Sequence, residues 1–157
     1  MGRYYTTDGG REGKFMFAVQ SSDDPELLGM HEQEPTEITY YADEDDAEHI
    51  KSMLDREYDA LDIPKDKRVY YRDKDDYKEW YKYEDEVLHD KVFVSVRDDD
   101  KETLAKHAGE TRWGSNKSNY CDFEINGNAI HMARIRLAVN ILSDIKDNGY
   151  CTLDAEL

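Results

Sequence analysis

Apolar residues recur at helical spacing in two long segments of the chain. In residues 47–61 they stand three and four positions apart, and the same spacing runs through residues 129–148 and stops before Gly149. Such spacing gives a helix one apolar face, so both segments are predicted to be amphipathic helices that cover a core. Asp43 is the expected cap of the first helix, whose core-facing side chains are Ala47, Ile50, Met53, Leu54, Tyr58 and Leu61.

Shorter segments with alternating or continuous apolar residues predict the strands. The predicted strands cover residues 3–5, 14–20, 36–41, 91–96, 120–125 and 150–157. The first two are expected to form a hairpin, because glycines lie between them. Two further helices are predicted at residues 75–89 and within residues 98–109, while residues 21–35 and 110–119 are predicted loops, the former with one helical turn near Pro25.

The order of these elements indicates the fold class. Strands and helices alternate without a regular βαβ repeat, which favours an α+β fold. We expect a single domain over residues 1–157, in which a mixed or mainly antiparallel sheet of about 5–6 strands packs against about 3 helices. Cys121 and Cys151 are too few for a disulfide framework and are predicted to be reduced and buried in strands.

Negative charge is concentrated in one quarter of the chain. The net charge is −16, and residues 23–62 hold 15 acids and two bases, a net charge of −13. This balance argues against direct binding to nucleic acid, whose phosphates need Lys and Arg, and against binding to an anionic membrane. No apolar run approaches the length of a bilayer span, so no membrane association is expected. A basic protein partner fits the charge.

Residue patterns typical of metal or catalytic sites are weak. Acids at residues 73, 75, 79 and 84 match a calcium-binding loop, but Tyr77 and Lys78 stand where that loop needs a ligand and a glycine. Acids at residues 98–100 are better explained as the cap of the following helix than as magnesium ligands. The five histidines form no zinc motif. No catalytic residue, metal site or cofactor is therefore predicted.

Both ends of the chain carry a resemblance. The opening "GRYY" followed by "GKFMFAVQSSDDPELLG", and more loosely the closing "YCTLDAEL", resemble a group of uncharacterised small proteins of bacteriophages and large DNA viruses. The resemblance covers roughly the first thirty residues and the last eight. That group has no established catalytic residues, so the resemblance implies no site residue. It implies a protein that acts inside an infected cell, in the host cytoplasm.

The acidic segment carries the functional hypothesis. Carboxylates at regular spacing approximate the phosphates of nucleic acid, so a basic groove built for DNA or RNA would attract them. We expect a non-enzymatic, anti-CRISPR-like nucleic-acid mimic that inhibits a host nucleic-acid-handling defence complex, with Tyr41 and Tyr58 as exposed stacking residues. The candidate partner-binding residues are Asp23, Asp24, Asp43, Glu44, Asp45, Asp46, Glu48, Asp55, Glu57 and Asp59.

Three alternatives remain open at this point. The acidic face could simply be solvated. The chain could be a small hydrolase or nuclease that uses carboxylates and a divalent metal, or a virion or assembly protein whose acidity serves solubility. Dependence of the melting temperature on Mg²⁺, Mn²⁺ or Ca²⁺ separates the hydrolase from the binding protein.

Overall fold

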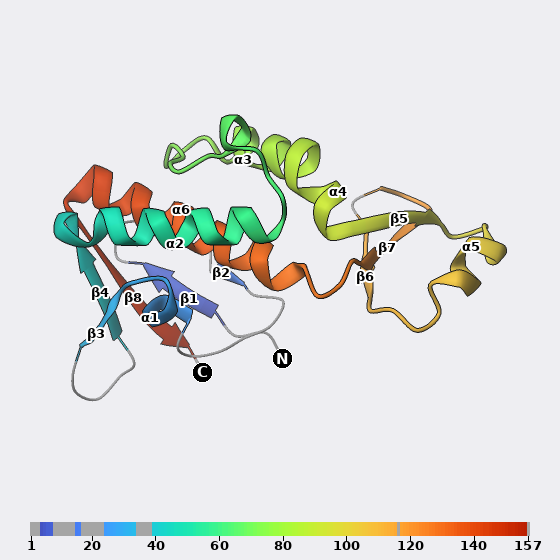
Figure 1. Cartoon of the computed structure of the whole chain (residues 1–157), viewed down its shortest axis with the longest axis horizontal. Helices are drawn as coiled ribbons and strands as arrows, with labels where there is room; N and C mark the ends of the chain where they lie inside the picture. Colours follow the sequence, from blue (N-terminus) through green and yellow to red (C-terminus); the bar gives the residue numbers. More distant parts are fainter. Residues whose placement is uncertain (1–3, 8–14, 17–23, 34–38, 116, 157) are drawn as a thin grey trace.

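The structure is a computed structural model that describes residues 4–7, 15–16, 24–33, 39–115 and 117–156, with side chains for residues 26–31, 40–115 and 117–154. Within these ranges the chain has the predicted α+β class, and every pair of neighbouring strands is antiparallel. Figure 1 shows two regions, a larger body and a smaller lobe, which consists of residues 93–124.

The body contains a five-stranded sheet. Its order is β2 (Phe15–Met16), β1 (Tyr4–Thr7), β8 (Tyr150–Glu156), β4 (Thr39–Asp43) and β3 (His31–Gln33). The hairpin of β1 and β2 is confirmed. Strand β3 corrects the prediction of a loop at residues 21–35. It is a three-residue edge strand that pairs with β4 alone, so it needs no apolar pattern of its own.

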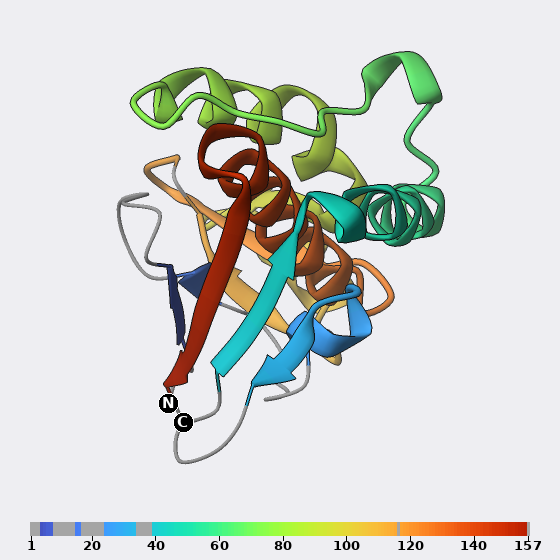
Figure 2. The same ribbon diagram turned by 90° about the vertical axis from the view of Figure 1, so that its left-hand side faces the viewer.

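Two long helices form the centre of the body. A 3₁₀ turn, η1 (Glu44–Asp46), leads into α2 (Ala47–Ala60), which runs antiparallel to α6 (Ala129–Asn148). Figure 2 shows β4 and β8 side by side, with α6 behind them and α2 next to α6. Gly149 has a φ of 85°, a left-handed conformation that favours glycine and ends α6 before β8 begins. The short helix α1 (Asp24–Leu27) is the predicted helical turn.

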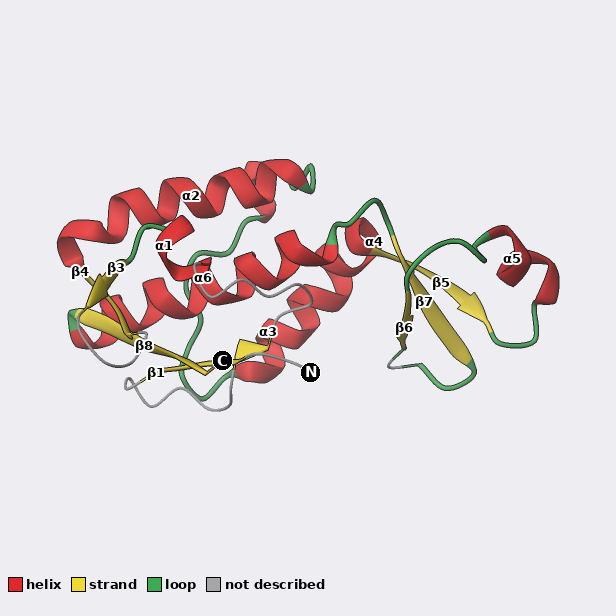
Figure 3. Cartoon of the chain, turned by 90° about the horizontal axis from the view of Figure 1, so that it is seen from below, coloured by secondary structure: helices red, strands yellow, loops and turns green. Residues whose placement is uncertain are grey.

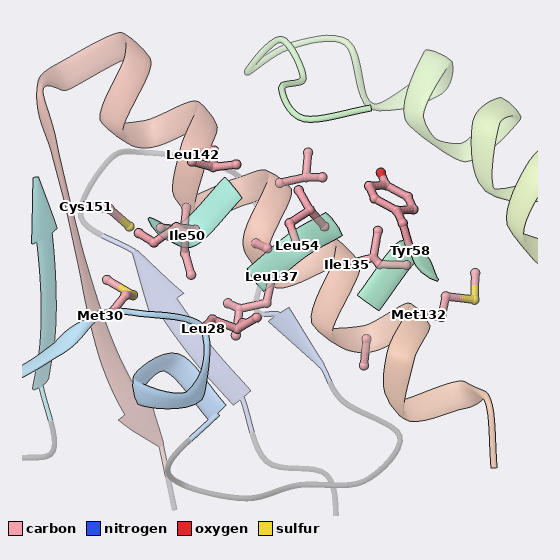
Figure 4. Packing of buried hydrophobic residues seen from close by; sticks show 14 of the residues in the cluster. Leu28, Met30, Ile50, Leu54, Tyr58, Met132, Ile135, Leu137, Leu142 and Cys151 are labelled. Atoms are coloured by element: carbon pink, nitrogen blue, oxygen red, sulfur yellow. The ribbon is translucent and has the colours of Figure 1, made fainter. Parts of the chain in front are cut away.

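The predicted apolar stripes form the core. Ile50, Leu54 and Tyr58 of α2 are fully buried, and they pack with Ile135 and Leu137 of α6 in one cluster (Figure 4). The burial of Tyr58 corrects the expectation that it is an exposed stacking residue. Its ring falls on the apolar face of the helix, and its hydroxyl donates to the carbonyl of Val69 at 2.5 Å. Tyr41 is half-buried and stacks on Tyr150 with ring centroids 6.4 Å apart.

A second helical segment connects the body to the lobe. After the 3₁₀ turn η2 (Lys65–Lys67), the chain forms α3 (Tyr77–Tyr83), a π-helical turn η3 (Glu84–Leu88) and α4 (His89–Val92). The helix predicted at residues 75–89 is therefore present, but it contains a π turn and ends at Val92. The strand predicted at residues 91–96 consequently begins only at Phe93.

The lobe is a separate three-stranded sheet with one short helix. Its order is β5 (Phe93–Arg97), β7 (Tyr120–Glu124) and β6 (Arg112–Gly114), and α5 (Lys101–Lys106) follows β5 in the chain. Figures 1 and 3 show this sheet projecting from the end of the body where α4 lies. Two findings correct the sequence prediction. The strands divide between two sheets, and β6 lies in a predicted loop, where pairing with β7 supplies its hydrogen bonds.

The two cysteines are free and buried, as predicted, and each lies in a different sheet. No helix in the described ranges is long and apolar enough to cross a membrane.

Candidate functional site

Two of the predicted partner-binding acids form the cap of η1 and α2. The side chain of Asp43 accepts a hydrogen bond from the backbone of Asp45 at 3.0 Å, and Asp46 accepts one from the backbone of Asp43 at 3.0 Å. His31 also lies 2.8 Å from Asp46. Burial alone would raise the pKa of Asp46, but the hydrogen bonds from Asp43 and His31 hold that pKa below its usual value. Asp43 and Asp46 therefore stabilise the helix start.

Two more acids hold the far end of α2. Asp55 lies 3.1 Å from the guanidinium of Arg68, and Asp59 binds the same guanidinium at 2.5 Å. Tyr70 donates its hydroxyl proton to Asp55, and burial together with this carboxylate raises the pKa of Tyr70 to about 12. Because the side chain of Arg68 is only 5% exposed, its charge needs both acids. Asp55 and Asp59 therefore have an internal partner.

Glu57 also pairs with residues of the body. Its carboxylate lies 2.6 Å from Nδ1 of His131 and 3.5 Å from the guanidinium of Arg134, both on α6. The Glu57 side chain is 15% exposed, so this contact joins α2 to α6 away from bulk water. A partner protein would have to compete with His131 and Arg134 for the Glu57 carboxylate.

Asp59 is exposed although it pairs with Arg68, and three further predicted acids are exposed without an ion pair. Glu44, Asp45 and Glu48 lie at the start of η1 and α2, and none of their side chains makes an ion pair with a described residue. We call these three residues the acidic ridge. The helix dipole favours acids at this position by about 0.3–1 kcal/mol each. The ridge lies at the end of the body opposite the lobe (Figure 1).

The last two predicted residues lie at the edge of the described ranges. Asp23 falls outside them, and for Asp24 the structure describes the backbone, which begins α1. The side chains of both acids therefore stay predictions. Of the ten candidates, the structure brings Glu44, Asp45 and Glu48 together at the surface and assigns internal partners to five others.

A second candidate site, absent from the sequence prediction, lies between the body and the lobe. A hollow of about 650 Å³, here called the junction pocket, is bounded on the body side by Asp85, His89 and Asp90. On the lobe side its walls include Phe93, Ser95 and Lys117. Hollows that bind small molecules have volumes of roughly 300–1,000 Å³, so the junction pocket has a suitable size.

A buried carboxylate supports both walls of this pocket. Asp122 of β7 is 4% exposed, and its two oxygens lie 2.7 Å from Oγ of Ser95 and 3.0 Å from Nε2 of His89. Hydrogen bonds from both groups satisfy the carboxylate, which would be costly to bury alone. In a hydrolytic triad the histidine lies between the serine and the carboxylate and takes the serine proton. Here Asp122 lies between them, so this network positions Ser95 and His89 without activating the serine in that way.

The structure describes no constellation of metal ligands. Within the described ranges, no three His, Cys, Asp or Glu side chains converge as they would around a metal ion. Glu84, the twelfth position of the calcium-loop pattern, is instead buried and accepts hydrogen bonds from Trp80 and Arg136. Asp100 caps α5 by accepting from the backbone of Thr103 at 3.1 Å, in agreement with the predicted capping role.

Comparison of the chain with family models, with curated proteins and with solved structures gives no match.

Proposed function

We propose that this chain is a non-enzymatic binding protein whose acidic ridge occupies the basic, nucleic-acid-binding surface of another protein. The observation that carries the proposal is the exposure of Glu44, Asp45 and Glu48. Their neighbours Asp43 and Asp46 are used in the helix cap, whereas these three carboxylates point their charge at solvent. Exposed carboxylates grouped within five residues produce a local negative field that a basic surface recognises.

The two bases nearest in sequence do not neutralise the ridge. The ammonium of Lys51 lies 4.6 Å from the ring centroid of Tyr70, a residue of the segment that follows α2. Arg56 lies eight residues beyond Glu48 and is exposed. The net charge of −13 in residues 23–62 supports the same reading, because it extends the field beyond the three ridge residues.

Charge and the resemblance of the chain's ends support the proposed class of partner. A basic groove evolved for DNA or RNA is the surface most complementary to grouped carboxylates. The resemblance of residues 1–30 to phage and viral proteins supports a host defence nuclease or CRISPR effector as the target, and the host cytoplasm as the place of action.

Affinity capture with matched baits tests the proposal. The baits are the wild type, a ridge variant (Glu44→Lys, Asp45→Lys, Glu48→Lys) and a control variant (Asp73→Lys, Asp75→Lys, Glu79→Lys). Both variants add the same charge on exposed residues, which in the control lie just before and within the first turn of α3. A nuclease-treated extract of the host is applied to each bait.

We expect wild type and control to retain a nucleic-acid-binding protein that the ridge variant loses, and that added duplex DNA or RNA displaces. Retention should weaken steeply with salt. Identical capture by all three baits, or capture that nucleic acid cannot displace, would contradict the proposal. Circular dichroism of both variants checks that they are folded.

A further inference from the structure

The π turn builds one wall of the junction pocket. In η3 the backbone N–H of His89 donates to the carbonyl of Glu84, five residues earlier, instead of four as in an α-helix. This wider turn allows residues five apart to share a face, and Asp85 and Asp90 both line the pocket with His89 between them. π turns interrupt helices at a cost and are frequent at functional sites. The turn is held by buried Glu84, which binds Trp80 and Arg136.

The lobe supplies the opposite wall, and its polar groups are fixed in position. Ser95 donates its proton to buried Asp122, so its oxygen keeps lone pairs that can accept from a ligand. The oxygen of Ser115 accepts from the backbone of Lys117 at 3.1 Å, so its hydroxyl proton can be donated. Phe93 packs between His89 and Trp113, with ring centroids 5.4 and 6.1 Å apart, and gives the pocket an apolar side.

Charges of both signs border the pocket. Asp85 makes no ion pair or hydrogen bond with a described residue, and Asp90 is exposed and lies 3.6 Å from Nδ1 of His89. Lys117 is exposed, and its ammonium lies 5.8 Å from the ring centroid of Tyr120 without an acidic partner among the described residues. The pocket is thus bordered by two acidic residues on the body side and by one basic residue on the lobe side.

We propose that the junction pocket binds a small zwitterion of the α-amino-acid class. Asp85 and Asp90 bind the ammonium of the ligand, Lys117 and the hydroxyl of Ser115 bind its carboxylate, and Phe93 contacts its carbon chain. A simple anion fits poorly because of the two aspartates and the net charge of −16. A simple amine would use only the two aspartates, whereas a zwitterion can contact charges on both walls. This site is independent of the acidic ridge, which lies at the other end of the body (Figure 1).

Titrations followed by ¹H–¹⁵N NMR test this site. Each of the twenty common amino acids is added singly, up to about 10 mM, the range that detects a Kd near 1 mM. At least one is expected to shift the amide signals of Ser95, Ser115 and Lys117. The amine that lacks the carboxylate of that amino acid, and the acid that lacks its ammonium, should each bind at least about tenfold more weakly.

Two matched variants locate the contact. Asp85→Asn with Asp90→Asn should weaken binding at least about tenfold, whereas Asp73→Asn with Asp75→Asn removes the same charge outside the pocket and should leave it unchanged. All four residues are exposed, so both variants should fold. The proposal is overturned if no amino acid shifts the pocket amides, if the amine binds as tightly as the amino acid, or if both variants bind like the wild type.

Discussion

The body and the lobe use the same kinds of elements but are stabilised differently. Among the described residues, the body has a cluster of 24 buried apolar residues, whereas the lobe has three, Val96, Cys121 and Phe123, with Leu104 packed against them. Each fully buried apolar side chain contributes about 1.5–3 kcal/mol, so the body's core far exceeds that of the lobe. The lobe depends in addition on contacts with the body, both polar, between Asp122 and His89, and apolar, where Phe93 and Trp113 pack against the body's cluster. A region held in this way can open locally while the rest stays folded.

Truncating one core residue in each region tests this difference and has the largest expected effect. Leu54→Ala leaves a cavity beside α6 and should lower the free energy of unfolding of the whole protein by about 2–5 kcal/mol. Phe123→Ala removes most of the lobe core, and it also removes the ring on which His107 stacks at 5.1 Å. The lobe should then open while the body keeps its stability.

Urea unfolding gives the global value, and native-state hydrogen exchange separates the regions. In Phe123→Ala, the amides of Val96 and Cys121 should exchange faster, and those of Leu54 and Ile135 should not. If Phe123→Ala lowers the protection of the body as much as Leu54→Ala does, the two regions unfold as one unit and the comparison fails.

The polar junction is the next target. Asp122→Ala leaves Ser95 and His89 without their shared acceptor, and loss of a buried hydrogen-bond partner costs about 1–3 kcal/mol. We expect this loss in the local stability of the lobe. Asp98→Ala is the matched control, because this exposed acid has only a long contact of 3.7 Å with Arg112 and should change stability by less than about 0.5 kcal/mol. Equal exchange rates in the two variants would show that Asp122 does not hold the lobe.

The body was largely predictable from sequence, and the reason is periodicity. The spacing of Ile50, Leu54 and Tyr58 places all three on one face only if the segment is a helix. Gly149 marks the end of α6 in the same direct way. The lobe was predicted less well. Strand β6 has three residues around Trp113, and only its pairing with β7 makes it a strand. The division of strands between two sheets depends on contacts between distant segments, which local patterns do not contain.

The candidate sites show the same limit. The sequence located the acidic segment. It could not show that Asp55, Glu57 and Asp59 pair with residues later in the chain, such as His131, which is 74 residues beyond Glu57. The junction pocket was missed because His89 and Asp122 are 33 residues apart. The local pattern gave no signal for this contact. Asp122 lies between Cys121 and Phe123 in a strand, where alternation predicts a solvent-facing acid, but in the structure Asp122 is buried and contacts His89 of the body.

High pH should weaken the body through its tyrosines, of which Tyr70 gives the most direct test. Burial, together with the hydrogen bond to Asp55, raises the pKa of Tyr70 to about 12, and burial also raises the pKa of Tyr58 and Tyr83. In the unfolded chain a tyrosine ionises near pH 10. The folded state therefore holds these protons more tightly. The part of this stability that Tyr70 contributes is fully present below about pH 10 and is lost as the pH rises through about 12.

The variant Tyr70→Phe isolates one part of this effect. At pH 7 it should be less stable than wild type by about 0.5–1.5 kcal/mol, because the hydrogen bond to Asp55 is gone. Between about pH 10 and 12 the stability of wild type should fall faster, so the difference between the two proteins shrinks. Tyr71→Phe, a change at the exposed neighbour, should run parallel to wild type. The measurement is urea unfolding across this pH range with the tyrosinate absorbance recorded at each pH; a constant difference for Tyr70→Phe would mean that Tyr70 ionises alike in the folded and unfolded chain.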